Sequence, residues 1–321
     1  MSKALALLFL EEAMKKILPY IMIAFGAALW GLIAIFVREL KEAGLTEMEI
    51  VTVRVTFAAI FLLIVGAVSY REQLQVQFKK LPFFIGTGIF SIAFFNYCYF
   101  FSINELNVSI AVILLYTSPA FVTILSFIFL KESIHKQKII AVVGTILGCV
   151  FIVGVGVEQG TTITLLGVLT GLGSGLGYAL YSIFGKVALK HEIKPFTVTL
   201  YTFVIAAIAL LPFSGIWGKL DILFSPRVLF VSVGLGLVPT VIAYLAYTWG
   251  LEKTESSKAA IIATVEPVVA MLIGFVIFQE NLGISQMFGA FLILLSVMFV
   301  NLPVMKGNEQ IKHHKNTGSI G

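Results

Sequence analysis

The acid with the clearest chemical potential is Glu266, which lies in the middle of a long apolar segment. That segment begins near Ser256, so about ten residues of helix would carry Glu266 roughly 15 Å along, to the middle of a bilayer. An ionisable group at that depth costs at least ~2.5 kcal/mol and normally faces a cavity or a partner. We expect Glu266 to carry a proton or to bind a cationic group. A structural hydrogen bond to a neighbouring helix is the alternative.

Arg54 is the second ionisable residue well inside an apolar segment, about five residues from its start. It could pair with a substrate or a gating group, or its charged end could reach back along its aliphatic stem to the membrane surface. No other acid of the sequence is predicted to lie at comparable depth in the membrane. Glu266 is therefore the one candidate for carrying a proton through the middle of the membrane.

Aromatic side chains with polar tips, together with one amide, form a further candidate group. Asn96 and Tyr99 are spaced to share one helix face. The other members are Trp30, Tyr116, Tyr178, Tyr244 and Tyr247. Such side chains could line a cavity that holds a flat or cationic small molecule. They could also anchor helix ends to lipid headgroups.

Residues for catalysis, nucleotide binding or metal binding form no recognisable pattern in the sequence. His135 and His191 fall in predicted loops, and no Gly-Lys-Ser motif for phosphate binding is present. We therefore expect neither an enzyme nor an ATP-driven pump, and no cofactor or metal. Any energy coupling must come from a gradient of an ion or a solute.

The elements that must position these residues are membrane-spanning helices. With 59% hydrophobic and 12% charged residues and a mean hydropathy of +1.01, the chain is too apolar for a soluble protein. Windows of about 20 apolar residues predict an all-α membrane protein. Its ten spans are predicted at 17–37, 50–70, 81–103, 107–130, 137–156, 164–188, 196–214, 226–250, 256–279 and 284–303.

The Lys and Arg residues indicate how these spans are oriented. If the N-terminus is cytoplasmic, the inner segments hold 17 of them and the outer connections hold four. Because excess positive charge marks the cytoplasmic side, we predict a multi-pass protein of the cell membrane with both termini in the cytoplasm. The basic residues lie in short loops, where they set orientation and do not point to a nucleic acid partner.

The sequence repeats itself at an offset of 148 residues. Pro119 and Pro267 are equivalent, and each lies within an apolar helix that ends in a glutamate, Glu132 or Glu280. Five spans per half is an odd number, so the second half must be inverted relative to the first, as in many carriers. We expect the prolines to loosen their helices. The glutamates are predicted to be helix caps, hinge contacts or gating groups. Arg54 is a further candidate for a gating group.

The domain boundaries follow from the repeat. Residues 17–157 and 164–303 are predicted to form the two five-helix halves, related by a two-fold axis in the membrane plane. Residues 1–16 are an N-terminal extension, which is either a short interfacial helix or sequence upstream of a start at Met14. Residues 304–321 are polar and are predicted to be a disordered cytoplasmic tail.

Several motifs resemble the EamA-type branch of the drug/metabolite transporter superfamily. They are Ala28-Leu-Trp-Gly31, Arg54-Val-Thr-Phe-Ala-Ala59, Ser118-Pro followed by Leu130-Lys-Glu132, and Val265-Glu-Pro-Val followed by Gln279-Glu280. The resemblance covers roughly residues 17–302. It departs from the family pattern at Gln279, where a small or apolar residue is usual.

The resemblance implies a carrier with a central cavity lined by spans 1, 3, 4, 6, 8 and 9, on which the candidate aromatic residues, Asn96 and Glu266 fall. It also implies export of amino acids, amines or related metabolites, often by proton or solute exchange. An uptake carrier for sugars or choline-like cations is an alternative, as is a membrane receptor or enzyme that transports nothing. The expected partners are a small-molecule substrate, protons and the lipid bilayer. The sequence leaves the oligomeric state open and is compatible with a monomer.

Overall fold

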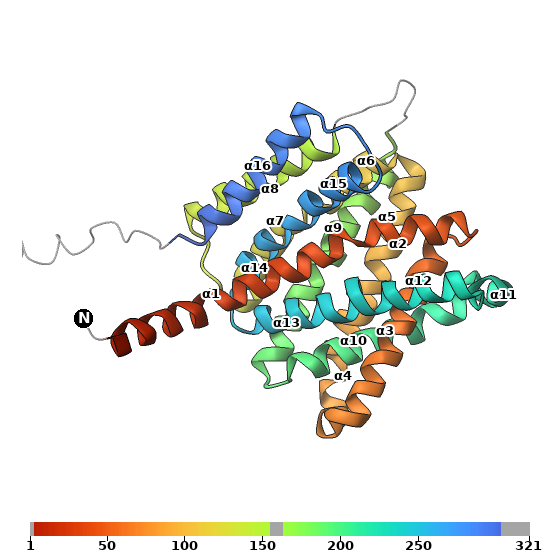
Figure 1. Ribbon diagram of the computed structural model, residues 1–321, viewed down its shortest axis with the longest axis horizontal. Helices are drawn as coiled ribbons and strands as arrows, with labels where there is room; N and C mark the ends of the chain where they lie inside the picture. The colour runs from red at the N-terminus through yellow and green to blue at the C-terminus, as the bar shows by residue number, and fades with distance from the viewer. Residues whose placement is uncertain (1–2, 155–162, 303–321) are drawn as a thin grey trace, which may run out of the picture.

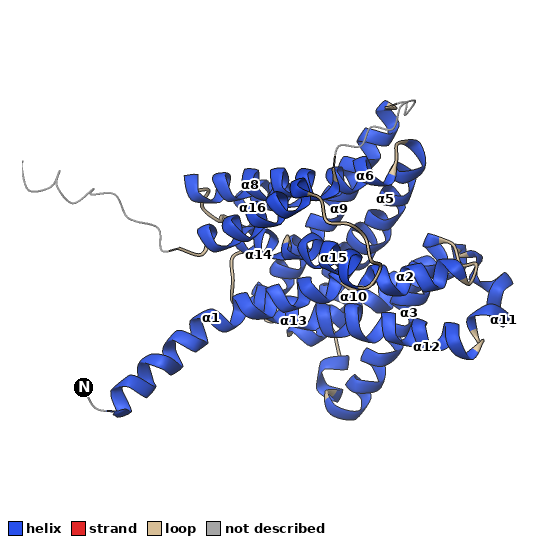
Figure 2. Ribbon diagram, turned by 45° about the horizontal axis from the view of Figure 1, so that its top comes forward, coloured by secondary structure: helices blue, strands red, loops and turns tan. Residues whose placement is uncertain are grey.

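The computed structural model describes residues 3–154 and 163–302, and of residues 3–13 it describes the backbone alone. Every secondary-structure element in these ranges is a helix (Figure 2). Nine of the described segments are long and apolar enough to cross a membrane, and a shorter apolar helix, α16 (Ile284–Val300), follows them. The prediction of an all-α protein with ten membrane helices is confirmed. The predicted tail, residues 304–321, lies outside the described residues.

The first half contains five spans, three of which are interrupted. The first is α1 (Lys3–Gly31) with α2 (Ile33–Glu42), and the second is α3 (Glu47–Ser69), followed by the short turns η1 (Arg71–Leu74) and η2 (Phe78–Lys80). The third span consists of α4 (Leu81–Ile85), the π-helical turn η3 (Gly86–Ala93) and α5 (Phe94–Glu105). The fourth consists of α6 (Val108–Leu115) and α7 (Ser118–Leu130), and the fifth is α8 (Lys136–Val153).

The second half follows the same order. Its first two spans are α9 (Leu165–Lys190) and α10 (Pro195–Leu210), followed by the short elements η4 (Leu211–Phe213), η5 (Gly215–Lys219) and α11 (Leu220–Leu223). The third is α12 (Pro226–Gly236), the π-helical turn η6 (Leu237–Ile242) and α13 (Ala243–Glu252). The fourth is α14 (Ser256–Ala263) with α15 (Val265–Val276), and the fifth is α16.

The interruptions of the fourth spans have one physical cause in both halves. A proline lacks an N–H, and its ring collides with the carbonyl four residues earlier. Four residues before Pro119 is Leu115, where α6 ends, and four before Pro267 is Ala263, where α14 ends. Each of these two spans is therefore interrupted near its middle, where backbone groups can bind other partners.

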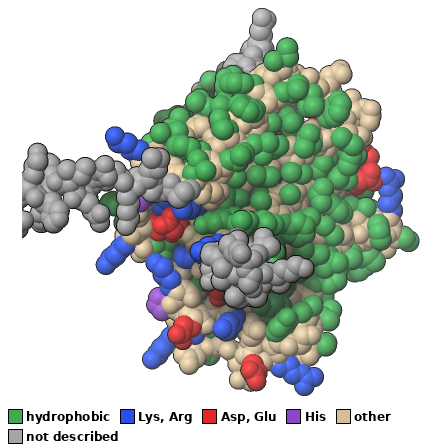
Figure 3. Space-filling view, turned by 60° about the vertical axis from the view of Figure 1, so that its left-hand side comes forward, with side chains coloured by type: hydrophobic (Ala, Val, Ile, Leu, Met, Phe, Trp, Pro, Cys, Tyr) green, Lys and Arg blue, Asp and Glu red, His purple; other side chains and the backbone are tan. Residues whose placement is uncertain are grey.

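The two ends of the helix bundle are named here after the predicted orientation. The inner end holds the connections at 70–77, 131–135, 191–194 and 253–255, and the outer end holds those at 43–46, 106–107, 211–225 and 277–283. In Figure 1 the start of α1 lies at the left and the outer-end helix α11 at the right. Figure 3 shows basic side chains gathered along one side of the molecule beside a broad hydrophobic surface, as expected for a protein embedded in lipid.

The last helix of each half packs against the other. α8 and α16 run side by side in Figures 1 and 2. A Cβ added at Gly148 would lie 2.6 Å from the side chain of Ile293 and 2.8 Å from the carbonyl oxygen of Gly289, so only glycine allows this approach. Gln137 and Ser285 donate hydrogen bonds across the two ends of the pair. Such close contact is how helices associate in lipid, where burial gives no drive. We call this pair the α8–α16 seam.

Candidate functional site

A cavity of ≈ 390 Å³ lies between the first half and α15. Its walls come from α1, α2, α3, α5, α6 and α15, and it extends from Glu266 to Lys41, Glu47 and Val108 at the outer end. None of its lining residues in the described chain lies at the inner end. Its size is within the range of small-molecule sites, about 300–1,000 Å³.

Glu266 lines this cavity from the first turn of α15. The break at Thr264 places it where the N–H groups of a helix have no partners within the helix and favour negative charge. Its side chain accepts a hydrogen bond from the hydroxyl of Tyr178 at 2.9 Å. No cation of the described residues forms an ion pair with it, so the carboxylate remains open to a ligand.

Arg54 lines the same cavity from α3. The residue is 8% exposed, and its Nε is buried without a hydrogen-bond partner. Across the described ranges, no acceptor or acid contacts its guanidinium. The sequence left open whether this side chain would reach back to the membrane surface; the structure places it inside the molecule.

The candidate aromatic residues divide between two places. Trp30, Asn96, Tyr99 and Tyr116 line the cavity. Tyr178, Tyr244 and Tyr247 lie behind Trp30 around a space of ≈ 10 Å³, with ring centroids 6.1, 5.0 and 5.1 Å from that of Trp30. These three tyrosines do not line the cavity, although the Tyr178 hydroxyl reaches Glu266, which does. Spans 6 and 8 therefore contribute to this second space and not to the main wall. Span 2, which the resemblance did not include, contributes Arg54.

Some of the polar groups in and beside the cavity form hydrogen bonds within the protein itself. Asn96 donates its Nδ2 hydrogen to the carbonyl of Ile92 in its own span at 2.7 Å. The hydroxyls of Tyr247 and Ser182 are hydrogen bonded at 2.7 Å, which ties α13 to α9. The indole Nε1 of Trp30 is buried without a hydrogen-bond partner among the described residues.

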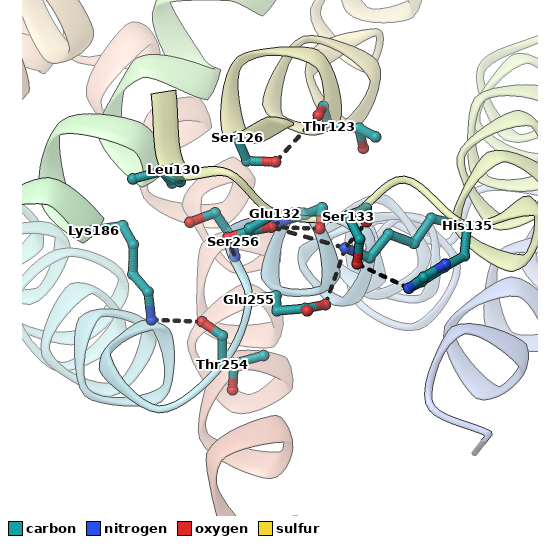
Figure 4. A network of polar contacts seen from close by, with 12 residues as sticks. Thr123, Ser126, Leu130, Glu132, Ser133, His135, Lys186, Thr254, Glu255 and Ser256 are labelled. Atoms are coloured by element: carbon teal, nitrogen blue, oxygen red, sulfur yellow. Dashed lines mark hydrogen bonds and ion pairs between the residues drawn. The ribbon is translucent and has the colours of Figure 1, made fainter. Parts of the chain in front are cut away.

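A polar network closes the inner end, where α7 meets the start of α14 (Figure 4). The Glu132 carboxylate accepts hydrogen bonds from the backbone nitrogens of Ser256 and Ser257 at 2.6 and 3.1 Å, and from the Ser257 hydroxyl at 2.7 Å. Burial alone would raise the pKa of Glu132, but these hydrogen bonds and the charge of Lys138 outweigh it and lower the pKa from its ordinary value of 4.5. Glu132 is therefore an ionised helix cap that joins the first half to the second.

A buried lysine, Lys138, and a half-buried one, Lys186, complete this network, which we call the inner gate. Lys138 lies 3.0 Å from the Glu255 carboxylate and donates to the carbonyl of Ser133 at 2.8 Å. Lys186 donates to three carbonyls at the end of α13, those of Leu251, Glu252 and Thr254, at 2.7, 3.0 and 2.8 Å. Both charges are thus fully provided with partners.

The repeat places an equivalent turn at the outer end. Lys131 and Gln279 both adopt left-handed backbone conformations, with φ of 58° and 56°. The N–H groups of Glu132 and Glu280 then donate to the carbonyls of Ser126 and Gly274 at 3.1 and 3.0 Å. The Glu280 side chain nevertheless is exposed and has no hydrogen bond or ion pair to any described residue. The two turns therefore have the same backbone conformation. Among the described residues, the Glu132 carboxylate has hydrogen-bond partners and the Glu280 carboxylate has none.

Sequence reasoning did not select several residues of these sites. Lys41 and Glu47 form an ion pair of 2.6 Å at the outer mouth of the cavity, and Lys138 and Lys186 lie in the inner gate. The sequence marked the lysines only as loop charges. Ser257 could have been found, because it occupies the same repeat position as Ser109 beside a helix start.

Comparison with known proteins gives a consistent result. The description "EamA-like transporter family" matches the chain twice, over residues 17–154 and 165–302. An uncharacterized transporter of Archaeoglobus fulgidus is 29% identical over 298 residues, which are 89% of this chain and 99% of that protein. The uncharacterized transporter YwfM of Bacillus subtilis is 28% identical over 76% of this chain and 83% of its own. A crystal structure with a TM-score of 0.69 and 16% identity covers 87% of this chain and 95% of its own, which shows a shared fold.

Proposed function

The chain belongs to the EamA-like transporter family, and we propose that this membrane transporter is a secondary carrier that exports amino acids or amines in exchange for protons. The observation that carries the proposal is the position of Glu266: a carboxylate without a cationic partner in the described structure, inside a cavity that extends to one end of the molecule only. A carrier of this kind needs a binding group that faces each side in turn.

Glu266 is proposed to bind the proton and the ammonium group of the solute in turn. Both are cations that a single carboxylate can hold, and they exclude one another, so a proton entering from outside displaces the solute. The hydrogen bond from Tyr178 holds the carboxylate in place in either state. The helix N-terminus also favours a negative charge on the carboxylate when neither ligand is bound.

Glu132 and Glu280 are proposed to be the two gating groups. In the state described, Glu132 holds the start of α14 and closes the inner end. The repeat equivalents of Ser256 and Ser257 are Val108 and Ser109, at the start of α6 and the outer mouth of the cavity. In the opposite state, Glu280 would accept hydrogen bonds from these two residues while Glu132 releases its own. The interrupted helices at Pro119 and Pro267 would allow each half-span to tilt.

We also propose that the carrier lies in the cell membrane with both termini in the cytoplasm, and that residues 17–157 and 164–303 are its two repeats. The state described would then be open to the outside. No cofactor is part of the proposed cycle.

The test is flux through proteoliposomes loaded with the twenty common amino acids and their decarboxylated amines. Acidifying the outside should drive efflux of at least one solute, as measured by mass spectrometry. Glu266→Gln keeps the side-chain shape and should abolish efflux driven by the pH gradient. Glu72→Gln, which removes an exposed acid at the inner end, is the matched control and should retain it. Glu266→Gln transporting at the wild-type rate with unchanged pH dependence would overturn the role of Glu266, and binding without any flux would indicate a receptor.

A further inference from the structure

We propose that Arg54 is the carboxylate-binding residue of the cavity, so that the solute is a zwitterion held between Arg54 and Glu266, an α-amino acid in preference to an amine. This inference rests on the proposed function and names the substrate class of the same site. The two side chains carry opposite charges, come from different halves of the molecule, and line one cavity.

The first argument is the missing partner of Arg54. Burying a cation is costly unless it is paired and hydrogen bonded. The Nε of Arg54 is buried and unpartnered, and its two Nη atoms have no partner in the described structure either, although they are not among its fully buried atoms. They therefore retain some exposure, and Arg54 is one of the residues that line the cavity. A planar guanidinium presents paired donors that match a carboxylate.

The second argument is the contrast with the buried Lys138 and the half-buried Lys186. Lys138 and Lys186 are surrounded by acids and carbonyls, as a structural charge should be. The repeat equivalent of Arg54 is Thr202, whose hydroxyl donates to Thr87 at 2.6 Å and to its own helix at 2.7 Å. One half of the repeat thus uses this position for packing, while the other provides an unused charge. A binding role explains that difference.

The third argument is that Arg54 and Glu266 do not form an ion pair with each other although they share the cavity. A solute with an anionic and a cationic group can lie between them and satisfy both. An amine or a choline-like cation would leave Arg54 without a partner, and a sugar would leave both charges unpaired. Tyr99, Tyr116 and Ile33 form the neighbouring wall, which suits an apolar or aromatic amino-acid side chain.

The experiment compares solutes that differ by one group. Proteoliposomes of the full chain are loaded with phenylalanine, leucine and alanine, or with 2-phenylethylamine, 3-methylbutylamine and ethylamine, and efflux is measured for wild type, Arg54→Gln and Arg54→Lys. We expect wild type to carry at least one amino acid at least 10-fold faster than its amine. Arg54→Gln should remove that preference by lowering amino-acid efflux 10- to 100-fold, since a charge-assisted hydrogen bond contributes on that scale. Arg54→Lys should restore part of it.

Controls separate this inference from the proposed function. Arg71→Gln removes an exposed arginine at the inner end and should leave the preference unchanged. If wild type carries amines as fast as amino acids, or Arg54→Gln lowers both equally, carboxylate recognition is refuted while export through the cavity stands. If wild type carries neither class of solute under any gradient, both the proposed function and this inference fail. A preference that disappears in Arg54→Gln but returns in Arg54→Lys cannot come from misfolding.

Discussion

Glu132→Gln tests whether the inner gate and its repeat equivalent alternate. The carboxylate accepts three hydrogen bonds, and the amide that replaces it has one accepting oxygen. At least one bond to a charged acceptor is lost, at about 2 kcal/mol. That difference shifts the equilibrium between the inner-closed and inner-open states about 30-fold. A state that is populated at about 1% would rise to about a quarter of the molecules.

Pulsed distance measurements between spin labels would detect this shift directly. One pair of labels, at Ile134 and Lys253, spans the inner end, and a second pair, at Asn104 and Asn281, spans the outer end; all four residues are exposed. We expect Glu132→Gln to add a longer inner distance and, in the same fraction of molecules, a shorter outer distance. Cys98 and Cys149 would be replaced by alanine to keep labelling specific.

Glu280→Gln is the decisive comparison. Its carboxylate has no hydrogen bond to a described residue in this state, so the substitution should leave the inner-closed state intact and remove only the contact proposed for the opposite state. The two substitutions should therefore change the populations in opposite directions. If Glu132→Gln lowers thermal stability without altering either distance distribution, Glu132 is only a helix cap and the alternation is refuted.

Two further predictions concern pH and packing. Because the pKa of Glu132 is lowered in the closed state, its contribution to closure is fully present above the ordinary pKa of 4.5 and is lost as pH falls through the lowered pKa. In a Glu266→Gln background, which removes the proposed proton site, the inner distance should stay constant from pH 8 to 5 and lengthen only below pH 4.5, and a transition near neutral pH in that background would contradict the assignment. Gly148→Ala should destabilise the α8–α16 seam by about 1–3 kcal/mol because the added methyl meets Ile293 and Gly289. Gly185→Ala is the control, because the added methyl meets only Leu251 at 3.6 Å, and it should be neutral or stabilising by up to about 1 kcal/mol. Equal thermal midpoints for the two variants would refute the packing argument.

The sequence predicts the helices and their inverted repeat because bilayer burial imposes length and composition on every span. It also explains why the fourth span of each half is interrupted, since proline acts through its own backbone. It does not predict which aromatic residues face the cavity. Tyr99 and Tyr247 are repeat equivalents of the same type, yet Tyr99 lines the cavity and Tyr247 lies behind Trp30, a difference that tertiary packing decides.

Contacts between the halves were equally beyond the sequence. Nothing near Glu132 indicates that its partners are Ser256 and Ser257, more than a hundred residues away. The repeat also gives equal support to closure at Glu132 and at Glu280. In the proposed cycle, the difference between the two ends belongs to the conformational state described, and a sequence that encodes two such states cannot single out one of them.

The α8–α16 seam constrains any motion between the two halves. Neither helix contributes a residue to the cavity wall, yet glycine contacts and the hydrogen bonds of Gln137 and Ser285 join them along their length. In the proposed carrier, this pair would be the fixed edge about which the two halves rock while their other contacts change. Opening at one end would then accompany closure at the other, so the passage would not form a continuous pore. A membrane that maintains a proton gradient could carry many copies of such a molecule without losing that gradient through it.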